Sequence, residues 1–254
     1  IYIKGTNLLK SINYIESRGS AQCKSSVMIA ALNTPGKTTI KAKKSRDHSE
    51  ILFKYLKIPI KIIKKKNFDL IEIKGEQNFK GFNYHIPSDI SSSAFFIVLT
   101  LLQKNSSLTI KGVNINPSRT GIITILNKMG ANIILKNKIK KYGELSADLF
   151  VKSVKSLKPI NCPTSLNSSA IDEFLVIFLI AAKAKGVSTF KNLSELNQKE
   201  SPRLKLGSHL LKVIGVKTEL TSDSLKIYGN PKLKLDKQYV IKDFLKDHRV
   251  FMAS

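Results

Sequence analysis

The chain has 254 residues, with 43 Lys and Arg against 18 Asp and Glu, a formal net charge of +25, and 42% hydrophobic residues. This length and composition predict one or two globular domains and exclude a disordered chain. The longest apolar runs, 94–99 and 174–182, are too short for the ~20 residues that span a bilayer, and no signal segment is recognisable. With only Cys23 and Cys162 present, a disulfide framework is not expected, and the sequence favours a cytoplasmic protein with no membrane partner.

The basic charge raises the question of nucleic-acid binding. Lysine accounts for 38 of the 43 basic residues, and these lysines are spread along the whole chain. There is no Trp, and no basic strip is interleaved with aromatic residues as a stacking platform for bases requires. We therefore expect a diffuse, solvated lysine surface and no nucleic-acid partner. The five arginines are more informative, because arginine is kept where a planar, two-pronged donor is needed. They are Arg18, Arg46, Arg119, Arg203 and Arg249.

Predicted helices and strands follow one order, β-α-β-α-β-β, in successive copies along the chain. The first copy is predicted at 12–16, 20–32, 38–41, 47–56, 58–63 and 69–74. The second is predicted at 82–86, 91–103, 108–111, 119–129, 132–135 and 148–152. The third, from its first helix, is predicted at 169–184, 187–191, 202–214, 216–220 and 224–228. A fourth copy begins near Tyr239 and stops within a helix that starts at His248.

The two helices of each copy differ in pattern. The first helix is almost entirely apolar, as in 94–102 and 174–182, which predicts burial on every side. The second helix has one apolar stripe, for example Ile122, Ile125 and Met129, and can face water on its other side. The predicted class is therefore α/β (α+β), with buried helices and outer sheets that each have one solvated face.

Polar and charged residues gather at the predicted helix starts. These positions bind anions, because their backbone N–H groups are unpaired and the helix dipole is positive there. Arginine adds a bidentate grip on phosphate or carboxylate. Simple capping is the alternative, since 169–172 has the form of a capping box and Ser201-Pro202 of a cap with a first-turn proline. The six segments are Ser20-Ala21-Gln22, Ser45-Arg46-Asp47-His48, Arg119-Thr120-Gly121, Asp172-Glu173, Lys199-Glu200-Ser201-Pro202-Arg203 and Asp247-His248-Arg249.

In order and spacing these segments resemble the motifs of the 5-enolpyruvylshikimate-3-phosphate synthase family, and the resemblance covers the whole chain. It implies repeated βαβαββ units in the enolpyruvyl transferase fold, an inside-out α/β barrel with buried helices. It also implies that 1–86 is the last part of an N-terminal domain. Residues 87–254 would then be the first two repeat units, and the start of the third, of a C-terminal domain.

The implied activity is transfer of the carboxyvinyl group of phosphoenolpyruvate to the 5-hydroxyl of shikimate 3-phosphate, with release of phosphate, on the route to aromatic amino acids. The resemblance implies no cofactor and no metal, and we expect a monomer. It assigns shikimate 3-phosphate to Ser20, Ala21, Gln22, Arg46, Asp172, Glu195 and Lys199. It assigns phosphoenolpyruvate to Gln22, Arg203 and Arg249.

The same resemblance makes Asp172 the proton acceptor and Glu200 the proton donor to carbon. The chemistry fits, since joining two anions needs cations to neutralise them, a base near the attacking hydroxyl and an acid near the methylene carbon. Lys199 and Arg203 are four residues apart across a helix start and are predicted to point the same way.

The sequence also departs from the family pattern. Pro202 stands where the family has Asp before the arginine, and Ser88 where it has Gly. The family's early Lys-Pro-Gly-type anion motif, its Asn-Gly turn with the following arginine, and its late C-terminal lysine have no match. We therefore expect a fragment that lacks both ends and has little or no turnover alone.

Two alternatives stay open. A sister class on the same fold transfers enolpyruvyl to UDP-N-acetylglucosamine and depends on a reactive cysteine in a flexible loop. Cys23 instead falls on an apolar helix face, where we expect its thiol to pack. The more distant alternative is a basic nucleic-acid-binding module, which predicts tight, strongly salt-dependent binding.

Overall fold

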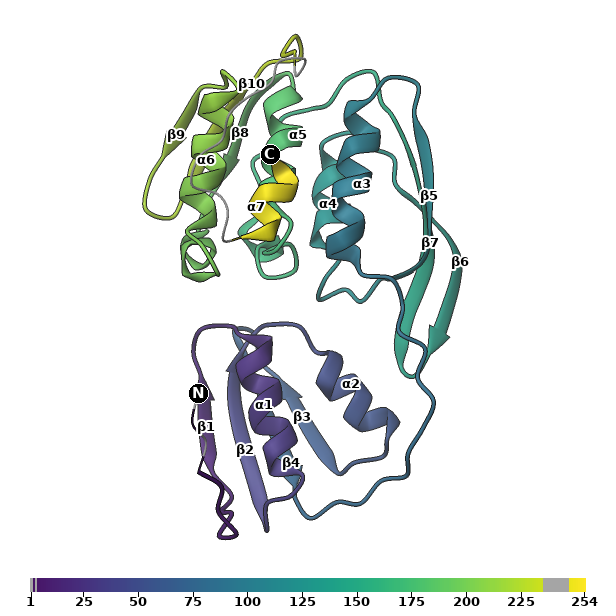
Figure 1. Cartoon of the computed structure of the whole chain (residues 1–254), viewed down its shortest axis with the longest axis vertical. Coiled ribbons are helices and arrows are strands. Elements are labelled where there is room, and N and C mark those ends of the chain that lie inside the picture. The colour runs from purple at the N-terminus through teal and green to yellow at the C-terminus, as the bar shows by residue number, and fades with distance from the viewer. Residues whose placement is uncertain (1, 3, 235–246) are drawn as a thin grey trace. The chain divides into compact units, whose positions relative to one another are not determined.

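A computed structural model of the chain describes residues 2, 4–234 and 247–254, except for the side chain of Phe251 (Figure 1). The chain divides into two compact units. The first unit comprises residues 1–86 and 140–144, and the second unit comprises 87–139 and 145–254. Among the described residues, no helix is both long and apolar enough to span a membrane.

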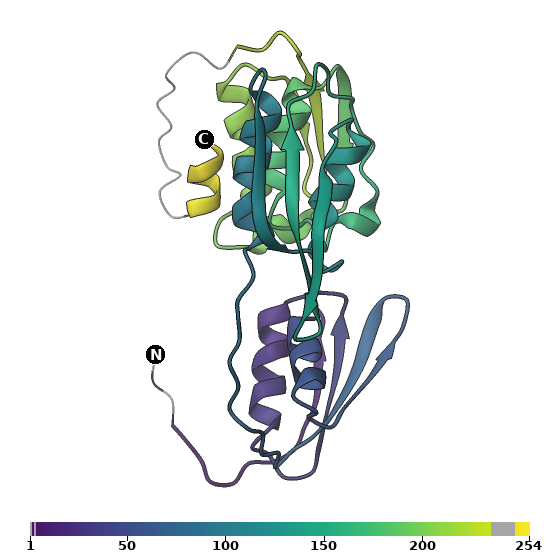
Figure 2. The same cartoon turned by 90° about the vertical axis from the view of Figure 1, so that its right-hand side faces the viewer.

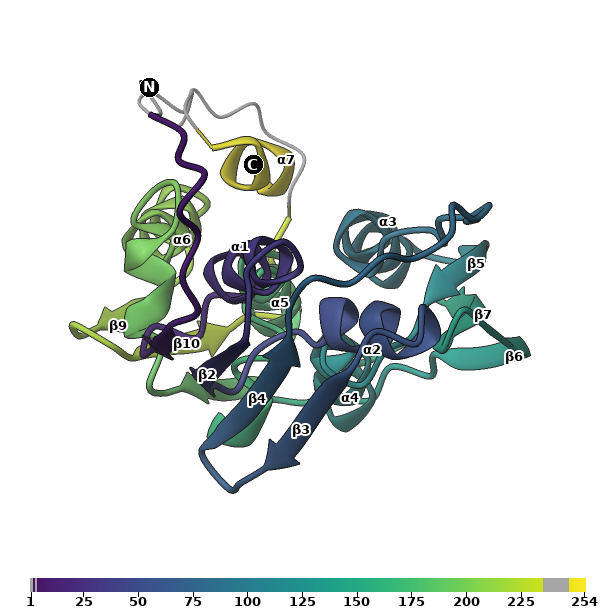
Figure 3. The same ribbon diagram turned by 90° about the horizontal axis from the view of Figure 1, so that it is seen from below.

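The first unit is a four-stranded sheet with two helices on one face (Figures 1 and 3). The strand order is β1-β2-β4-β3; β1 pairs in parallel with β2, and the other neighbours are antiparallel. The elements are β1 (Asn13–Glu16), α1 (Ala21–Ala31), β2 (Lys37–Lys43), α2 (His48–Tyr55), β3 (Ile60–Lys64) and β4 (Phe68–Lys74).

Alternation along the strands forms the core of the first unit. In β2, Thr38, Ile40 and Ala42 are buried while residues between them face outward, as a sheet covered on one face requires. Ile40 packs with Ile71 and with Met28 of α1 in one apolar cluster. The helices therefore cover one face of this sheet only.

The second unit contains two three-stranded sheets with helices between them (Figures 1 and 2). One sheet has the order β5-β7-β6 and the other β8-β10-β9. The helices are α3 (Ile90–Leu102), α4 (Gly121–Lys128), α5 (Phe174–Lys183), α6 (Arg203–Val213) and α7 (His248–Ala253). The strands are β5 (Ser107–Asn114), β6 (Ile134–Lys141), β7 (Glu144–Lys152), β8 (Gly186–Phe190), β9 (Thr218–Leu220) and β10 (Leu225–Gly229). Short 3-10 turns lie at Thr164–Leu166 (η1) and Ser194–Gln198 (η2).

The predicted burial of the first helix of each copy on every side is nearly met only in α5. Every residue of α5 except Leu179 and Lys183 is buried. Helix α3 leaves Phe96 and Leu99 more than half exposed, and α1 leaves Ile29 58% exposed. The reason is position, because α5 lies among the other helices of its unit whereas α1 packs on a single sheet (Figure 3). The single apolar stripe of the second helices is confirmed in α4.

Two predicted elements were wrong. Residues 82–86 form no strand: the rings of Phe82 and Tyr84 pack edge-on, Phe82 also packs on Tyr55, and Ile86 is 80% exposed. The third copy's first helix begins at Phe174 and not at 169, because the Ser169 carbonyl accepts the N–H of Gly121 and residues 169–173 form turns. The strand predicted near Tyr239 lies outside the described residues.

Gly75 and Gly229 occupy equivalent places at the end of the last strand in the first and third copies. A Cβ on Gly75 would lie 1.6 Å from the carbonyl oxygen of Thr34, and one on Gly229 would lie 2.2 Å from that of Ala184. Both glycines therefore allow the strand end to contact the backbone just after the first helix of its copy.

Gly75→Ala is expected to destabilise the first unit by about 3 kcal/mol or more, because backbone atoms must move to admit the methyl group. Urea denaturation followed by circular dichroism measures this loss. Gly81→Ala is the matched control, since a Cβ there has nothing within 4 Å. Equal stability of the two variants would show that the close approach at Gly75 is not required.

Candidate functional site

The start of α1 carries three of the residues predicted to bind shikimate 3-phosphate. Ser20 is the N-cap, and its Oγ accepts the Cys23 N–H at 3.2 Å. Ala21 is half-buried and Gln22 is exposed. The predicted helix start is therefore present, with capping and anion binding both available to Ser20.

Arg46 lies in the loop between β2 and α2 and is half-buried. The first turns of α1 and α2 touch, since the hydroxyls of Ser25 and Ser49 are 2.6 Å apart. The N-termini of α1 and α2 thus lie at one end of the first unit (Figure 1), and Arg46 lies in the loop that leads into α2. Helix dipoles and a guanidinium at one end give a local positive field suited to a phosphorylated ligand.

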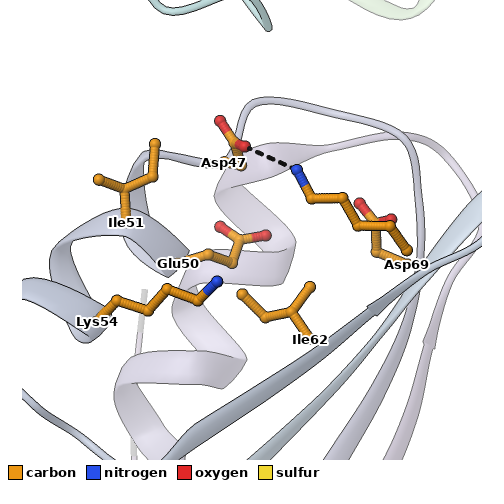
Figure 4. Close-up of a pocket in the computed structure, with 7 residues that line it drawn as sticks. Asp47, Glu50, Ile51, Lys54, Ile62 and Asp69 are labelled. Atoms are coloured by element: carbon orange, nitrogen blue, oxygen red, sulfur yellow. Dashed lines mark ion pairs between the residues drawn. The ribbon is translucent and has the colours of Figure 1, made fainter. Parts of the chain in front are cut away.

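A pocket in the first unit lies between α2 and strands β3 and β4 (Figure 4). It contains none of the residues predicted to bind substrate, and its charges are mixed. Within the described part of the chain, no group of three or more His, Cys, Asp or Glu side chains could hold a metal ion. The lining residues are Asp47, Glu50, Ile51, Lys54, Ile62, Lys64 and Asp69.

In the second unit, three carboxylates surround the guanidinium of Arg203, which is 1% exposed. Its Nε donates to Asp247 Oδ2 at 2.8 Å, its Nη1 to Asp172 Oδ1 at 3.1 Å, and its Nη2 to Glu200 Oε2 at 2.5 Å. Arg203 is thus fixed in place, and its positive charge is more than matched. An anionic substrate that binds this guanidinium must therefore compete with the three carboxylates for its N–H donors.

The two predicted catalytic carboxylates differ in environment although they share Arg203. The Asp172 side chain is 10% exposed and lies in the turn before α5, whereas that of Glu200 is 63% exposed and lies before α6. One is enclosed and the other is open to solvent. The two carboxylates therefore share one cation but differ in their access to solvent.

Asp247 connects Arg203 to the start of α7. Ser201 Oγ donates to Asp247 Oδ2 at 2.7 Å, and the Arg249 backbone N–H donates to Asp247 Oδ1 at 3.0 Å. Burial opposes ionisation of Asp247, but the hydrogen bonds from Arg203 and Ser201 prevail and lower its pKa. Burial lowers the pKa of Arg249, partly opposed by Glu173. Arg249 therefore lies in the first turn of α7, with its backbone bonded to the same Asp247 that pairs with Arg203.

A second network lies beside it. Arg119 Nη2 donates to Asp89 Oδ1 and to Ser91 Oγ, both at 2.6 Å, and Ser91 Oγ donates to Glu173. Asp89 also caps α3 by accepting the Ser92 N–H at 2.8 Å. Burial acts to raise the pKa of Asp89, but the hydrogen bonds from Ser92 and the Arg119 charge outweigh it and lower the pKa.

The structure pairs Lys199 with Glu195, a carboxylate that is not among the partners of Arg203. The Lys199 Nζ lies 3.2 Å from Glu195 Oε1, and both side chains are about a quarter to a third exposed. Lys199 follows η2 and Arg203 begins α6. The ion pairs of Lys199 and Arg203 go to different carboxylates, so they do not support the prediction that the two side chains point the same way.

Two further sequence interpretations were wrong. Ser169–Asp172 is not a capping box, because α5 starts later and the Ser169 hydroxyl donates to the Leu166 carbonyl. Cys23 is exposed and not packed, because it lies on the outward side of α1. Sequence reasoning also missed the roles of Ser91 and Glu173. Both are polar residues at the start of an apolar helix, Ser91 in α3 and Glu173 just before α5. Because polar groups that are buried need hydrogen-bond partners, a contact between the two could have been expected from the sequence.

Asp89→Asn is expected to remove the pH dependence that this carboxylate contributes to the stability of the second unit. Because the folded pKa is lowered, ionised Asp89 stabilises the fold above pH ~4, and this contribution disappears as pH falls through the folded pKa. Asparagine keeps the cap. Since the carboxylate is 40% exposed, the wild-type advantage at pH 7 is expected to be below about 1 kcal/mol. Urea unfolding at pH 7 and pH 2.5 measures it, and a difference independent of pH would contradict the assignment.

The chain matches a known protein family along its whole length. The profile of the EPSP synthase (3-phosphoshikimate 1-carboxyvinyltransferase) family matches residues 1–254. A 3-phosphoshikimate 1-carboxyvinyltransferase of Vesicomyosocius okutanii is 41% identical over 254 residues, which is 100% of this chain and 57% of that protein. The one from Ruthia magnifica is 39% identical over 252 residues, covering 99% of this chain and 56% of that protein. The chain thus spans a little over half the length of these relatives.

Solved structures show the same fold. The EPSP synthase of Acinetobacter baumannii superposes with a TM-score of 0.77 at 35% identity, covering 88% of this chain and 50% of that one. The enolpyruvyl transferase NikO of Streptomyces tendae gives a TM-score of 0.62 at 14% identity, covering 89% of this chain and 52% of that one, a likeness of fold alone. With its repeated elements, its arginine–carboxylate cluster and a family match over its whole length, the chain has the enolpyruvyl transferase fold and belongs to the EPSP synthase family.

Proposed function

We propose that the protein carrying this chain is a 3-phosphoshikimate 1-carboxyvinyltransferase, EC 2.5.1.19, which acts in the shikimate pathway. The observation that carries the proposal is the shared guanidinium: Arg203 holds Asp172 at 3.1 Å and Glu200 at 2.5 Å. Two carboxylates with unlike exposure are thereby held within reach of one reacting centre. That is the arrangement needed for a reaction with one proton removed and one added.

In the proposed reaction, the 5-hydroxyl oxygen of shikimate 3-phosphate forms a bond to C2 of phosphoenolpyruvate. Asp172 accepts the hydroxyl proton while Glu200 gives a proton to the methylene carbon, which becomes a methyl group. Glu200, now ionised, then takes a proton from the methyl carbon as the C2–O bond to phosphate breaks, and Asp172 gives its proton to the leaving phosphate. The carboxyvinyl ether and inorganic phosphate are released, and both carboxyl groups return to their starting states. Both substrates are anions, so arginine contacts orient them and offset their charge.

The binding roles follow the sequence assignment. Ser20, Ala21, Gln22 and Arg46 hold shikimate 3-phosphate from the first unit, supported by the adjacent helix starts there. Asp172, Glu195 and Lys199 are assigned to the same substrate. Gln22, Arg203 and Arg249 bind phosphoenolpyruvate. These side chains come to their substrates from helix starts and turns, where unpaired N–H groups add to the positive field.

The remaining assignments are part of the same proposal. Residues 1–86 are the last part of an N-terminal domain, and 87–254 contain the first two repeat units and the start of the third unit of a C-terminal domain. The protein acts as a cytoplasmic monomer without cofactor. Analytical ultracentrifugation of the protein checks the oligomeric state.

The test uses a hybrid enzyme in which these 254 residues replace the matching segment of the Vesicomyosocius okutanii relative. Phosphate release is followed in a coupled assay with phosphoenolpyruvate and either shikimate 3-phosphate or UDP-N-acetylglucosamine. Release with shikimate 3-phosphate is expected. Release with the UDP-sugar alone would overturn the proposal in favour of the sister class, in which exposed Cys23 would then be examined.

A further inference from the structure

Lys24 is the charged residue of α1, and its side chain is buried although much of this helix is exposed to solvent. Its side chain is 2% exposed, whereas Gln22, Cys23 and Ile29 of the same helix are exposed. The ammonium lies 2.6 Å from Glu50 Oε1, and Glu50 is itself only 3% exposed. A lysine is rarely buried to this extent unless its charge is paired. The ion pair with Glu50 is therefore what allows the Lys24 ammonium to be buried.

The same ammonium also binds the backbone of a residue proposed to hold substrate. Lys24 Nζ donates to the carbonyl oxygen of Arg46 at 2.7 Å. Lys24 lies in the first turn of α1, Glu50 in the first turn of α2, and Arg46 in the loop between β2 and α2. One side chain thus ties the two helix starts to the Arg46 backbone, and we name Lys24, Glu50 and the Arg46 carbonyl the Lys24 clamp.

The burial and charge of the Lys24 clamp argue against a direct role in anion binding. The ammonium is enclosed, and Glu50 neutralises it. A contribution to stability alone is also a poor explanation, because a buried ion pair is often no more stabilising than two apolar side chains of similar size. Here the pair leaves Glu50 Oε2 buried without a hydrogen-bond partner among the described residues, which adds a cost.

What the ion pair supplies, and an apolar pair would not, is a directed hydrogen bond to the Arg46 carbonyl. The neighbouring Ser45 hydroxyl is buried and makes no hydrogen bond to the described residues, so it does not anchor the loop. Glu50 is in turn held on α2, facing the pocket that Asp47 and Asp69 also line (Figure 4). The bond from Lys24 therefore connects the Arg46 backbone directly to the first turn of α1.

We propose that Lys24, held by Glu50, is a positioning residue that fixes Arg46 beside the Ser20–Gln22 helix start for the phosphorylated substrate. The inference rests on the proposed function, in which these residues bind shikimate 3-phosphate. It predicts that loss of the clamp weakens binding of that substrate. Phosphoenolpyruvate binding by Gln22, Arg203 and Arg249 is expected to stay unchanged, because the clamp holds the Arg46 backbone and none of these three residues.

The test replaces the pair by apolar residues, Lys24→Met with Glu50→Leu, so that no buried charge is left unpaired. In the hybrid enzyme the KM for shikimate 3-phosphate is expected to rise about 10-fold, as for loss of a hydrogen bond from a charged group. The KM for phosphoenolpyruvate is expected to stay within about twofold. Lys37→Met with Glu72→Leu is the matched control, because that pair of the same unit is 3.6 Å apart and its lysine is 61% exposed.

A second readout does not depend on activity. In the isolated 254-residue chain, NMR relaxation of the Arg46 Nε–H group is expected to show greater mobility in the double variant, with Arg119 as the internal reference. If the hybrid with the unchanged segment is inactive but Arg46 is more mobile in the double variant, the proposed function is refuted. The positioning of Arg46 by Lys24 is then still supported. An unchanged KM for shikimate 3-phosphate in an active hybrid, or equal rises in both KM values with a lower Tm, would overturn the positioning role.

Discussion

Asp172→Asn in the hybrid enzyme is expected to lower kcat by about 10²- to 10⁴-fold while both KM values change little. Asparagine keeps the size of the side chain and can still accept the Nη1–H bond from Arg203, which spans 3.1 Å in the wild type. It cannot accept the proton of the attacking hydroxyl. The loss is therefore confined to the transition state, and steady-state kinetics with each substrate varied in turn measures it.

Glu200→Gln is the companion variant, with a similar fall in kcat because an amide cannot give a proton to carbon. Its side chain is 63% exposed, so the change is expected to leave stability within about 0.5 kcal/mol. Lys226→Met, in an exposed ion pair with Glu219, serves as a control for unspecific charge effects. A raised KM with unchanged kcat for Asp172→Asn would make Asp172 a binding group and not the base.

Arg203→Met is expected to have the largest effect on stability, about 3–5 kcal/mol at pH 7, because it leaves two enclosed carboxylates without their cation. Asp172 and Asp247 are 10% and 1% exposed, respectively, and both depend on this guanidinium. Urea denaturation of the 254-residue chain measures the loss. The deficit is expected to shrink toward pH 3, since protonation of the carboxylates removes their repulsion.

Arg119→Met is the matched control for this loss. Arg119 also pairs with a carboxylate, but that partner, Asp89, is 40% exposed and keeps its hydration when the cation is removed. A loss well below that of Arg203→Met is expected. Equal losses would mean that burial of the carboxylates does not govern the energetics, and the description of Arg203 as the centre of the cluster would then be wrong.

Much of the fold could be predicted because each copy buries its side chains in a regular pattern. The alternation in β2 and the apolar stripe of α4 determine which face is covered, and both are visible in the sequence. The run 82–86 has the composition of a strand but forms none, since aromatic packing on Tyr55 takes the place of a sheet. That choice depends on a residue far away in sequence, which local pattern does not include.

The candidate site was less predictable, because its geometry depends on partners from different copies. The Arg203 contacts join Asp172, Glu200 and Asp247, the first and last of which are distant in sequence. In the sequence Lys24 and Glu50 each look like ordinary solvated charges, and only the ion pair between α1 and α2 reveals that both are buried. Motif resemblance supplied roles for residues, but not these contacts.

Helix α5 touches α3, α4, α6, α7 and β10, so none of these elements can separate from the second unit without exposing it. Its residues 174–178 are all buried. Local opening therefore gives solvent little access to the α5 backbone, and its amide protons are expected to exchange only when the whole unit unfolds. The second unit is therefore expected to unfold cooperatively around one apolar helix. The amide protons of α1, which has one side open to solvent, are expected to exchange through local fluctuations of the first unit.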